Sequence, residues 1–318
     1  MAEAKQTMYG GQAVIEGVMM RGPQHFAVAA RRADGTVALT CELVPKIFRP
    51  AWQKLAFVRG GFALVDSMTL GTKALFWAAK VAEAGVAPTP NIGEIDAEAK
   101  KPTGASDTLI GGAMVTGLLM AVFLFKILPQ LGLEALRRTG HFAPYQLGLI
   151  HFSVAITIFV GYISLVARME HVRRVFQYHG AEHKAINALE AGQELTVENV
   201  LAASRLHPRC GTSFVILVIL LSVLCAMPFY GQPVYIRIPI QLAFVVPVAG
   251  LGFELLRLSG KFRHNPFMAA LARPGMWTQL LTTREPDAGQ CEVAIASLKA
   301  VLDIENPRAP EAPAADLS

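Results

Sequence analysis

Four long apolar stretches limit what this chain can fold into. They run from Leu109 to Leu128, Leu147 to Ala167, Ser213 to Phe229 and Ile236 to Leu256. Each has roughly the 17 to 22 residues that a helix needs to cross the hydrocarbon core of a membrane. With 53% hydrophobic and only 17% charged residues, the chain is also too apolar for an ordinary soluble enzyme. We therefore expect an α-helical integral membrane protein with about four transmembrane helices.

The first two of these stretches are the clearest. Lys126 is their only Lys, Arg, Asp or Glu, and it lies near one end, where its long side chain can reach the lipid headgroups. The fourth stretch differs because it contains prolines and polar residues, namely Arg237, Pro239, Gln241, Pro247 and Glu254. These residues predict a kinked helix that its neighbours shield from lipid.

The positions of Lys and Arg predict the orientation in the membrane. The loop between the first and second stretches holds only Arg137 and Arg138. The loop between the second and third holds Arg168, Arg173, Arg174, Lys184, Arg205 and Arg209, and the segment after the fourth adds Lys261, Arg263 and Arg273. The positive-inside rule therefore places both termini and the loop at 168–212 in the cytoplasm. The polar N-terminus shows no signal peptide.

Charge and cysteine content indicate the partners and the compartment. A net charge of +5 fits contact with anionic lipid headgroups. No basic run interleaved with aromatic residues predicts nucleic-acid binding. The cysteines are scattered at Cys41, Cys210, Cys225 and Cys291, and a cytoplasmic placement would keep those outside the spans reduced. We expect membrane lipid as a partner and no nucleic acid.

The N-terminal region predicts a small folded unit outside the spans. Short strands are expected at 13–20, 25–32 and 36–44, with turns at 21–23 and 34–35. Asp34-Gly35 is a strong hairpin signal, so these strands predict a small antiparallel sheet. From 52 to 82 the apolar residues recur at helical spacing. This predicts one or two amphipathic helices on the cytoplasmic side, broken near Gly60-Gly61 or at Gly71.

The remaining segments complete the predicted organisation. A helix is expected after Thr196, which is a good capping residue, and an amphipathic helix from Glu292 to Ile304. The chain then divides into a sheet with amphipathic helices at 1–84, a flexible linker at 85–108, two spans at 109–167, a cytoplasmic loop at 168–212, two spans at 213–257, a helical segment at 258–305 and a disordered tail at 306–318.

The cytoplasmic loop contains the motif H-x-x-E-H at His179-Gly180-Ala181-Glu182-His183. On a helix the two imidazoles share one face, with the glutamate within reach of whatever they bind. The Ala- and Glu-rich sequence around them favours a helix. In inverted zincins the histidines of this motif bind zinc and the glutamate activates water. The spacing therefore predicts His179 and His183 as metal ligands and Glu182 as a catalytic base.

A catalytic zinc normally takes three ligands from the protein, so a further ligand is needed. His207 and Cys210, just before the third span, are both good zinc ligands. Glu254 in the fourth span is another candidate, since a buried carboxylate is costly without a cation. Other roles stay open: Cys210 could simply be a small residue at a helix start, and Glu254 could pair with Arg257 or Lys261.

The glycine-rich segment from Gly10 to Pro23 holds two charged residues, Glu16 and Arg21, in an apolar context. Its glycines indicate close approach of the backbone to a partner or ligand. It is not a phosphate-binding loop, because no Gly-Lys-Ser/Thr ending follows. On composition alone, a hairpin packed on the membrane helices with Glu16 in an ion pair is the simpler interpretation.

Four motifs in order resemble one family, the YqhQ-like bacterial membrane proteins, catalogued as domain of unknown function 1385 and described as predicted metal-dependent enzymes. They begin at Gly10, Tyr178, His207 and Arg273, and read GGQAVIEGVMMRGP, YHGAEHK, HPRCGTS and RPGMW followed by LLTTREP. The resemblance implies a multi-pass protein of the bacterial inner membrane. It also implies site roles for His179, Glu182, His183, His207 and Cys210, and for Glu16 and Arg21.

Three functions follow as hypotheses. The first is a cytoplasm-facing, membrane-embedded hydrolase with a divalent transition metal, zinc foremost, in which Glu182 is the base and Glu16 and Arg21 hold the substrate. The second is a non-catalytic scaffold or assembly factor with a closed structural site of His179, His183, His207 and Cys210. The third is a transporter component, which would need a homo-oligomer to form a path. A protease is not favoured, because the sequence indicates no peptide-binding edge strand.

Overall fold

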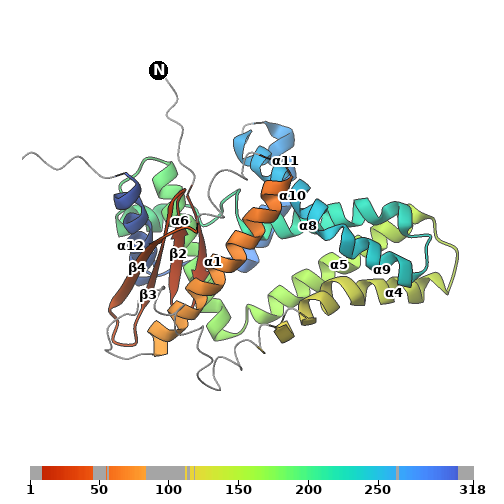
Figure 1. The fold of residues 1–318 in the computed structure, drawn as a ribbon, viewed down its shortest axis with the longest axis horizontal. Coiled ribbons are helices and arrows are strands. Elements are labelled where there is room, and N and C mark those ends of the chain that lie inside the picture. The colour runs from red at the N-terminus through yellow and green to blue at the C-terminus, as the bar shows by residue number, and fades with distance from the viewer. Residues whose placement is uncertain are drawn as a thin grey trace, which may run out of the picture.

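The computed structural model describes residues 9–45, 55, 57–83, 112, 115–117, 119–262 and 265–306. Figure 1 shows an elongated molecule with a sheet and its flanking helices at one end and long apolar helices that extend from it. It is mostly helical, as expected, and contains the expected small antiparallel sheet. The linker predicted at 85–108 and the tail predicted beyond Asn306 lie outside the described residues.

The N-terminal sheet has four strands in the order β1-β2-β3-β4, and each neighbouring pair is antiparallel. The strands are β1 (Gly10–Val14), β2 (Gly17–Arg21), β3 (His25–Arg31) and β4 (Val37–Leu43). The turn at Asp34-Gly35 connects β3 to β4 as predicted, with a φ of 87° at Gly35. Because each strand follows its neighbour directly, β1 and β4 form the two edges of the sheet.

The first predicted strand is wrong. Residues 13–20 do not form one strand, because a turn at Ile15 and Glu16 separates β1 from β2. Glu16 adopts a φ of 50°, which lies in the left-handed region that few residues other than glycine visit. The next residue, Gly17, lies so close to β3 that a β carbon would come within 2.2 Å of the Ala29 carbonyl oxygen. Gly17 indicated a turn, but the apolar residues around it led to the prediction of one continuous strand.

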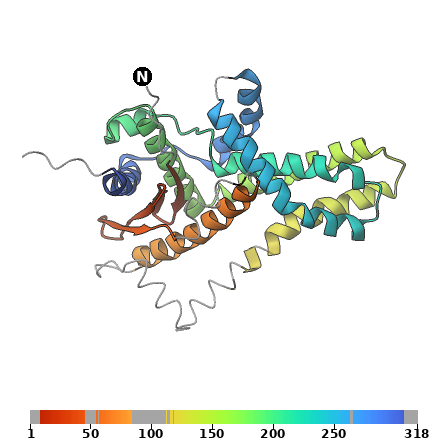
Figure 2. The same ribbon diagram turned by 45° about the horizontal axis from the view of Figure 1, so that its top comes forward.

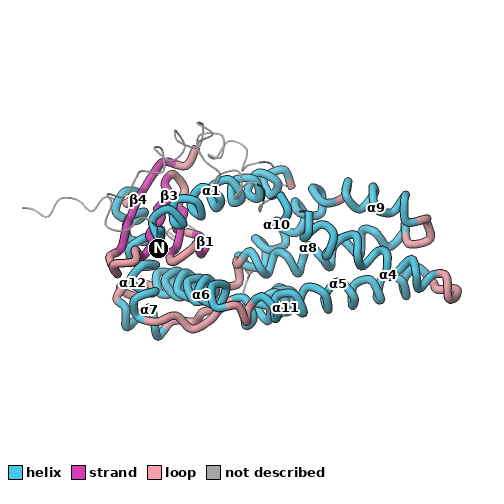
Figure 3. The backbone as a smooth tube through the Cα atoms, turned by 90° about the horizontal axis from the view of Figure 1, so that it is seen from below, coloured by secondary structure: helices cyan, strands magenta, loops and turns pink. Residues whose placement is uncertain are grey.

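The sheet is the middle layer of three. Side chains alternate along each strand, so Met19 and Val28 face helix α1 (Val58–Glu83), whereas Met20 and Ala29 face helices α6 (Glu170–Glu190) and α12 (Ala288–Glu305). In Figure 2 the orange α1 and the green α6 lie on opposite sides of the strands. Figure 3 shows α6 and α12 together on the side away from α1. Both faces of the sheet are therefore buried, and α6 packs against β1, β2 and α12.

Helix α1 corrects another expectation, because it runs unbroken through both of its predicted break points. A β carbon at Gly60 would come within 2.9 Å of the Gly250 α carbon in helix α10 (Val245–Lys261), and one at Gly71 would come within 2.2 Å of the Gln12 side chain. Glycine costs about 1 kcal/mol relative to alanine inside a helix. Here these two positions allow close packing instead of ending the helix.

The C-terminal helix α12 was predicted correctly in its apolar pattern. It begins after Asp287, whose side chain caps it by accepting a hydrogen bond from the Gln290 N–H at 2.8 Å. The fully buried Ser297 links α12 to the sheet, because its hydroxyl accepts from the Met20 N–H at 3.1 Å and donates to the Ala27 carbonyl at 3.0 Å. The short helix α7 (Val197–Ala202) begins, as predicted, after Thr196.

In the part of the chain that the structure describes, three helices are long and apolar enough to cross a membrane, or four if one bent pair counts as a single span. They are Val115–Arg137, which includes α4 (Leu128–Arg137); α5 (Pro144–Val166); Gly211–Phe229, which includes α8 (Gly211–Ala226); and the pair α9 (Val234–Ala243) with α10, bent by 48°. The bend agrees with the kink predicted for the fourth stretch. Helix α11 (Pro266–Thr282) packs against α8 and α10.

The polar residues of the apolar helices have partners inside the bundle. Arg237, which is 1% exposed, donates to Glu134 at 2.8 Å. Gln130 donates to Gln241 at 2.8 Å. This is the shielding by neighbouring helices that a polar residue in such a helix requires.

Candidate metal centre

Helix α6 presents His179 and His183 on one face, as the four-residue spacing predicts. Their rings lie 4.4 Å apart between centroids. The glycine of the motif, Gly180, allows the segment before α12 to cross the helix closely, since a β carbon there would lie 2.0 Å from the Arg284 carbonyl oxygen. The Arg284 N–H donates to the Phe176 carbonyl at 2.8 Å and fixes this crossing. The helix is thus held in place at the motif itself.

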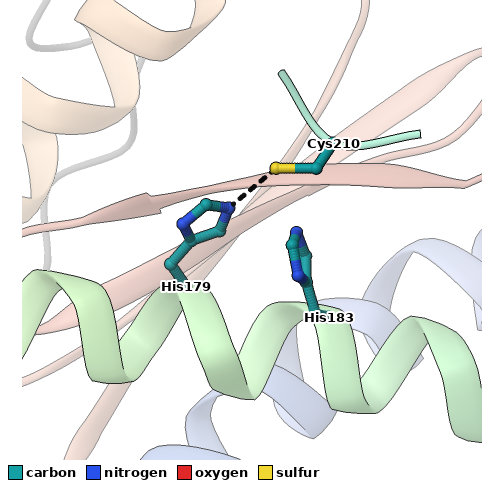
Figure 4. Close-up of side chains that lie close together, drawn as sticks. All are labelled: His179, His183 and Cys210. Carbon is teal, nitrogen blue, oxygen red and sulfur yellow. Dashed lines mark hydrogen bonds between the residues drawn. The ribbon is translucent and has the colours of Figure 1, made fainter. Parts of the chain in front are cut away.

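Cys210 completes a cluster with the two histidines. Its Sγ lies 3.3 Å from Nε2 of His179, and the potential ligand atoms of the three residues all lie within 4.8 Å of one another. Figure 4 shows both imidazoles extending from α6 toward the thiol on the opposite side. Ligand atoms on one tetrahedral zinc lie roughly 3.3–3.7 Å apart, given bond lengths of about 2.0–2.3 Å. The cluster is therefore close to the size of a zinc site.

Main-chain carbonyls orient both imidazoles. Nδ1 of His179 lies 2.9 Å from the Thr282 carbonyl oxygen, and Nδ1 of His183 lies 2.6 Å from that of Arg205. A carbonyl can only accept, so each Nδ1 carries a proton, and in the neutral form of the ring the lone pair is on Nε2. Metal-binding histidines are usually held in this way by a second hydrogen bond. The arrangement fits a metal ion bound through the two Nε2 atoms and Sγ.

Glu182 lies beside the cluster in an almost closed environment. It is 4% exposed, and its Oε2 lies 3.9 Å from Nε2 of His179. The carboxylate accepts a hydrogen bond from the main-chain N–H of Gly11 in β1. Burial raises the pKa of Glu182 to about 7, and a bound cation nearby would favour its charged form. His179, His183 and Cys210 form a three-donor group to which Glu182 does not belong. A carboxylate that lies beside the ligands without being one of them is expected of a base next to an open coordination site.

Lys184 and Asn187 on α6 bind the main chain of the loop that carries Cys210. The buried Lys184 donates to the carbonyls of Leu201 and Ala203, both at 2.8 Å. Asn187 donates to the Ser204 carbonyl at 2.6 Å. Sequence reasoning missed these supports, as well as the carbonyls of Thr282 and Arg205, because a main-chain acceptor leaves no mark in a sequence.

The structure places His207 near the cluster but not in it. Its ring centroid lies 5.8 Å from that of His183, and its Nε2 lies 3.5 Å from Oε2 of Glu190. Gln279 holds its main chain by accepting from the N–H at 2.8 Å and donating to the carbonyl at 2.7 Å. Burial lowers the pKa of His207. Among the described residues, the metal group consists of His179, His183 and Cys210 alone.

Glu254, also considered as a ligand, has a different partner in α10. Its carboxylate forms an ion pair with Arg59 and accepts a hydrogen bond from the Phe57 N–H at 3.1 Å. Arg59 lies 195 residues earlier in the chain, so helical spacing could not reveal this pair. The local sequence suggested only Arg257 and Lys261 as partners of Glu254.

Glu16 and Arg21 are also engaged in ion pairs. Glu16 accepts from Nε of Arg174 at 2.6 Å and from the Tyr178 hydroxyl at 3.3 Å. Arg21 lies 2.6 Å from a carboxylate oxygen of Asp66, whose side chain is 7% exposed. Glu16 thus has the ion pair that composition suggested, and its partner Arg174 stands on α6 five residues before His179. Neither residue belongs to the three-donor group in the described part of the chain.

Comparisons with known proteins agree on one family. The family model described as "Protein of unknown function (DUF1385)" matches residues 55–304. The chain is also 36% identical over 301 residues to "Uncharacterized protein YqhQ" of Bacillus subtilis (strain 168), a match that covers 93% of each chain. No solved structure matches. The match to the relative spans almost the whole chain, whereas the family model begins after the four-stranded sheet.

Proposed function

Because this chain belongs to the DUF1385 family, whose function is unknown, we propose its activity from the site itself. It is a metal-dependent hydrolase of the bacterial cytoplasmic membrane, with its metal centre at the cytoplasmic face. The observation that carries the proposal is the buried Glu182 next to a group of three ligand atoms, from His179, His183 and Cys210. Three protein ligands with a carboxylate beside the remaining position are typical of catalytic zinc.

Each residue has a separate task in this proposal. His179, His183 and Cys210 would bind the ion, most simply zinc, which would supply Lewis acidity that makes a water molecule a better nucleophile at neutral pH. Glu182 would take a proton from the attacking water and deliver it to the leaving group. The hydrogen bond from the Gly11 N–H would hold the carboxylate in position for both transfers.

The placement in the membrane rests on the apolar helices. Cys210 is the N-cap residue of α8, which begins one of the candidate spans. The metal centre therefore lies where a span meets the sheet unit. The basic residues of the 168–212 loop favour the cytoplasmic side for this boundary.

The alternative of a structural site in a scaffold or assembly factor requires a fourth protein ligand. His207 was the expected candidate, but its Nε2 lies next to Glu190 and outside the three-donor group. A three-ligand site leaves one position for water. This difference supports catalysis over a purely structural role.

Replacing Glu182 by Gln tests the proposal. The full-length protein would be purified in detergent, analysed for metal, and assayed against a panel of chromogenic ester, peptide and phosphodiester compounds. We expect Glu182→Gln to keep the metal and to lose about 10²–10⁴-fold of the activity, the usual contribution of a general base. Glu170→Gln, which changes an exposed glutamate at the start of the same helix, is the matched control for loss of a carboxylate. Full activity in Glu182→Gln would contradict the assignment of the base.

A further inference from the structure

Strand β1 is an edge strand that lies beside the metal centre. It pairs with β2 on one side, and the four-stranded sheet has no other strand next to it in the described part of the chain. Its first three residues, Gly10, Gly11 and Gln12, are exposed. Natural proteins usually cover or distort an open edge, because its unpaired main-chain groups bind other strands. An exposed edge next to a candidate hydrolytic site therefore requires an explanation.

The pairing of β1 with β2 shows which main-chain groups face outward. Val14 pairs with Gly17 across a two-residue turn, so this pair is hydrogen-bonded, and the bonded pairs alternate along an antiparallel ladder. Gly11 and Ala13 then belong to the pairs that are not bonded to β2. Two contacts agree with this register: the Gly11 N–H donates to Glu182, and the N–H of its partner Met20 donates to Ser297 instead of to β1.

Ala13 consequently directs its N–H and its carbonyl away from the sheet. Neither group has a hydrogen-bond partner among the described residues. The Gly11 carbonyl faces the same way, while the Gly11 N–H is bonded to Glu182. The open edge thus offers acceptors at positions 11 and 13 and a donor at 13, with the catalytic carboxylate at one end of this row.

We propose that the free edge of β1 binds a polypeptide substrate in an extended conformation, so that the hydrolase is a peptidase; this rests on the function proposed above. A row of main-chain donors and acceptors with the spacing of a strand is complementary to another extended peptide backbone. Esters of lipids or nucleotides lack the alternating N–H and C=O groups that would match it. The glycines at 10 and 11 present no side chain to hinder the approach of a peptide.

The reaction is an ordinary hydrolysis of an amide. The oxygen of water adds to the carbonyl carbon of the peptide, and the bond from this carbon to nitrogen then breaks. Glu182 takes one proton from the water and gives it to the leaving nitrogen. The products are a carboxylate and an amine, and no oxidant or reductant takes part.

Proline at position 13 tests the edge on the protein side. Ala13→Pro removes the outward N–H and leaves the bonds between β1 and β2, which do not use it. Full-length zinc-loaded protein would be assayed with a library of internally quenched fluorescent peptides. We expect kcat/KM to fall roughly 2- to 10-fold, mainly through KM, with unchanged metal content, because one hydrogen bond to the substrate is lost. The control is Ala33→Pro, an exposed turn position at which proline is favoured.

N-methylated peptides test the edge on the substrate side and do not depend on the folding of a variant. Methylation removes one backbone donor at a time, so strand addition predicts that cleavage by the wild-type protein is lost at alternate positions only. Equal tolerance at every position would overturn the proposal. Hydrolysis of esters or phosphodiesters but of no peptide by metal-loaded protein would also overturn the proposal. This result would still agree with the proposed hydrolase function. Protein without stoichiometric metal would instead contradict the proposed function.

Discussion

The main chain of Gly11 lies directly against the side chain of Glu182. A β carbon at position 11 would come within 2.8 Å of Cγ of Glu182 and within 2.7 Å of the Met19 carbonyl oxygen. The Gly11 N–H also donates to the carboxylate. This contact joins the N-terminal glycine motif to the H-x-x-E-H motif, although they are far apart in the sequence. A strand that has no metal ligand therefore positions the proposed base.

Gly11→Ala should disturb the position of Glu182 without affecting metal binding. The added methyl group has no room, so it should displace Glu182, and a displacement of about 1 Å can cost roughly 10²-fold in rate. We expect hydrolysis to fall by about that factor while the metal stays bound, as measured by activity and metal analysis on the same preparation. Gly10→Ala is the matched control, because a β carbon there meets nothing within 4 Å. Equal activity of the two variants would show that Gly11 does not position the base.

Lys184→Met should loosen the loop that carries Cys210. The substitution leaves the carbonyls of Leu201 and Ala203 without their donor, at a cost of about 1–3 kcal/mol for each group that stays buried. We expect the affinity for zinc to fall roughly 10- to 100-fold, as is usual when a supporting contact of a metal site is lost. Competition with a chelator of known affinity measures this.

Lys299→Met is the control for Lys184→Met, since Lys299 is an exposed lysine on α12. It should bind zinc like the wild type. An unchanged affinity in Lys184→Met would mean that the loop keeps its position without the lysine.

Glu16→Gln distinguishes an ion pair from a substrate contact. Hydrogen bonds from Arg174 hold the pKa of Glu16 below its usual value. The pair therefore stabilises the fold above the usual pKa of a glutamate, and this contribution is lost as the pH falls through the lowered value. Because the Arg174 side chain is 45% exposed, we expect a loss of at most about 1 kcal/mol at neutral pH and none at low pH.

Thermal unfolding of Glu16→Gln and of the wild type over a range of pH would measure this difference. Glu194→Gln, which changes an exposed glutamate, is the control. If Glu16→Gln instead raised KM without changing stability, Glu16 would be a substrate residue, as the family resemblance implied.

The regular elements could be predicted from the sequence because their signals are local. Apolar runs of spanning length marked the candidate membrane helices, and the spacing of His179 and His183 placed both on one face of α6. Asp34-Gly35 marked one hairpin correctly. The turn at Glu16 was missed, since its conformation depends on the fit of Gly17 against β3. Gly60 and Gly71 were misread as helix breaks because their packing partners lie in distant segments.

The candidate site could be predicted only in part, for the same reason. Cys210 was among the expected ligands and lies with the two histidines. Nothing local separated it from His207, which the structure places next to Glu190. Glu254 attracted attention as a carboxylate in an apolar helix, and its charge is balanced by Arg59 from α1. The contact between Gly11 and Glu182 joins distant segments and could not be read from either motif.

Metal binding by single-residue variants tests whether His179, His183 and Cys210 bind a metal ion. Full-length protein would be purified with zinc, and its metal content and X-ray absorption spectrum measured for the wild type, Cys210→Ser, His183→Ala, His207→Ala and Glu254→Gln. We expect about one zinc per chain with one sulfur ligand in the wild type, loss of zinc in His183→Ala, and loss of the sulfur signal in Cys210→Ser. His207→Ala and Glu254→Gln should keep both. Wild-type protein without stoichiometric metal, or a zinc site without sulfur, would contradict the proposed metal site.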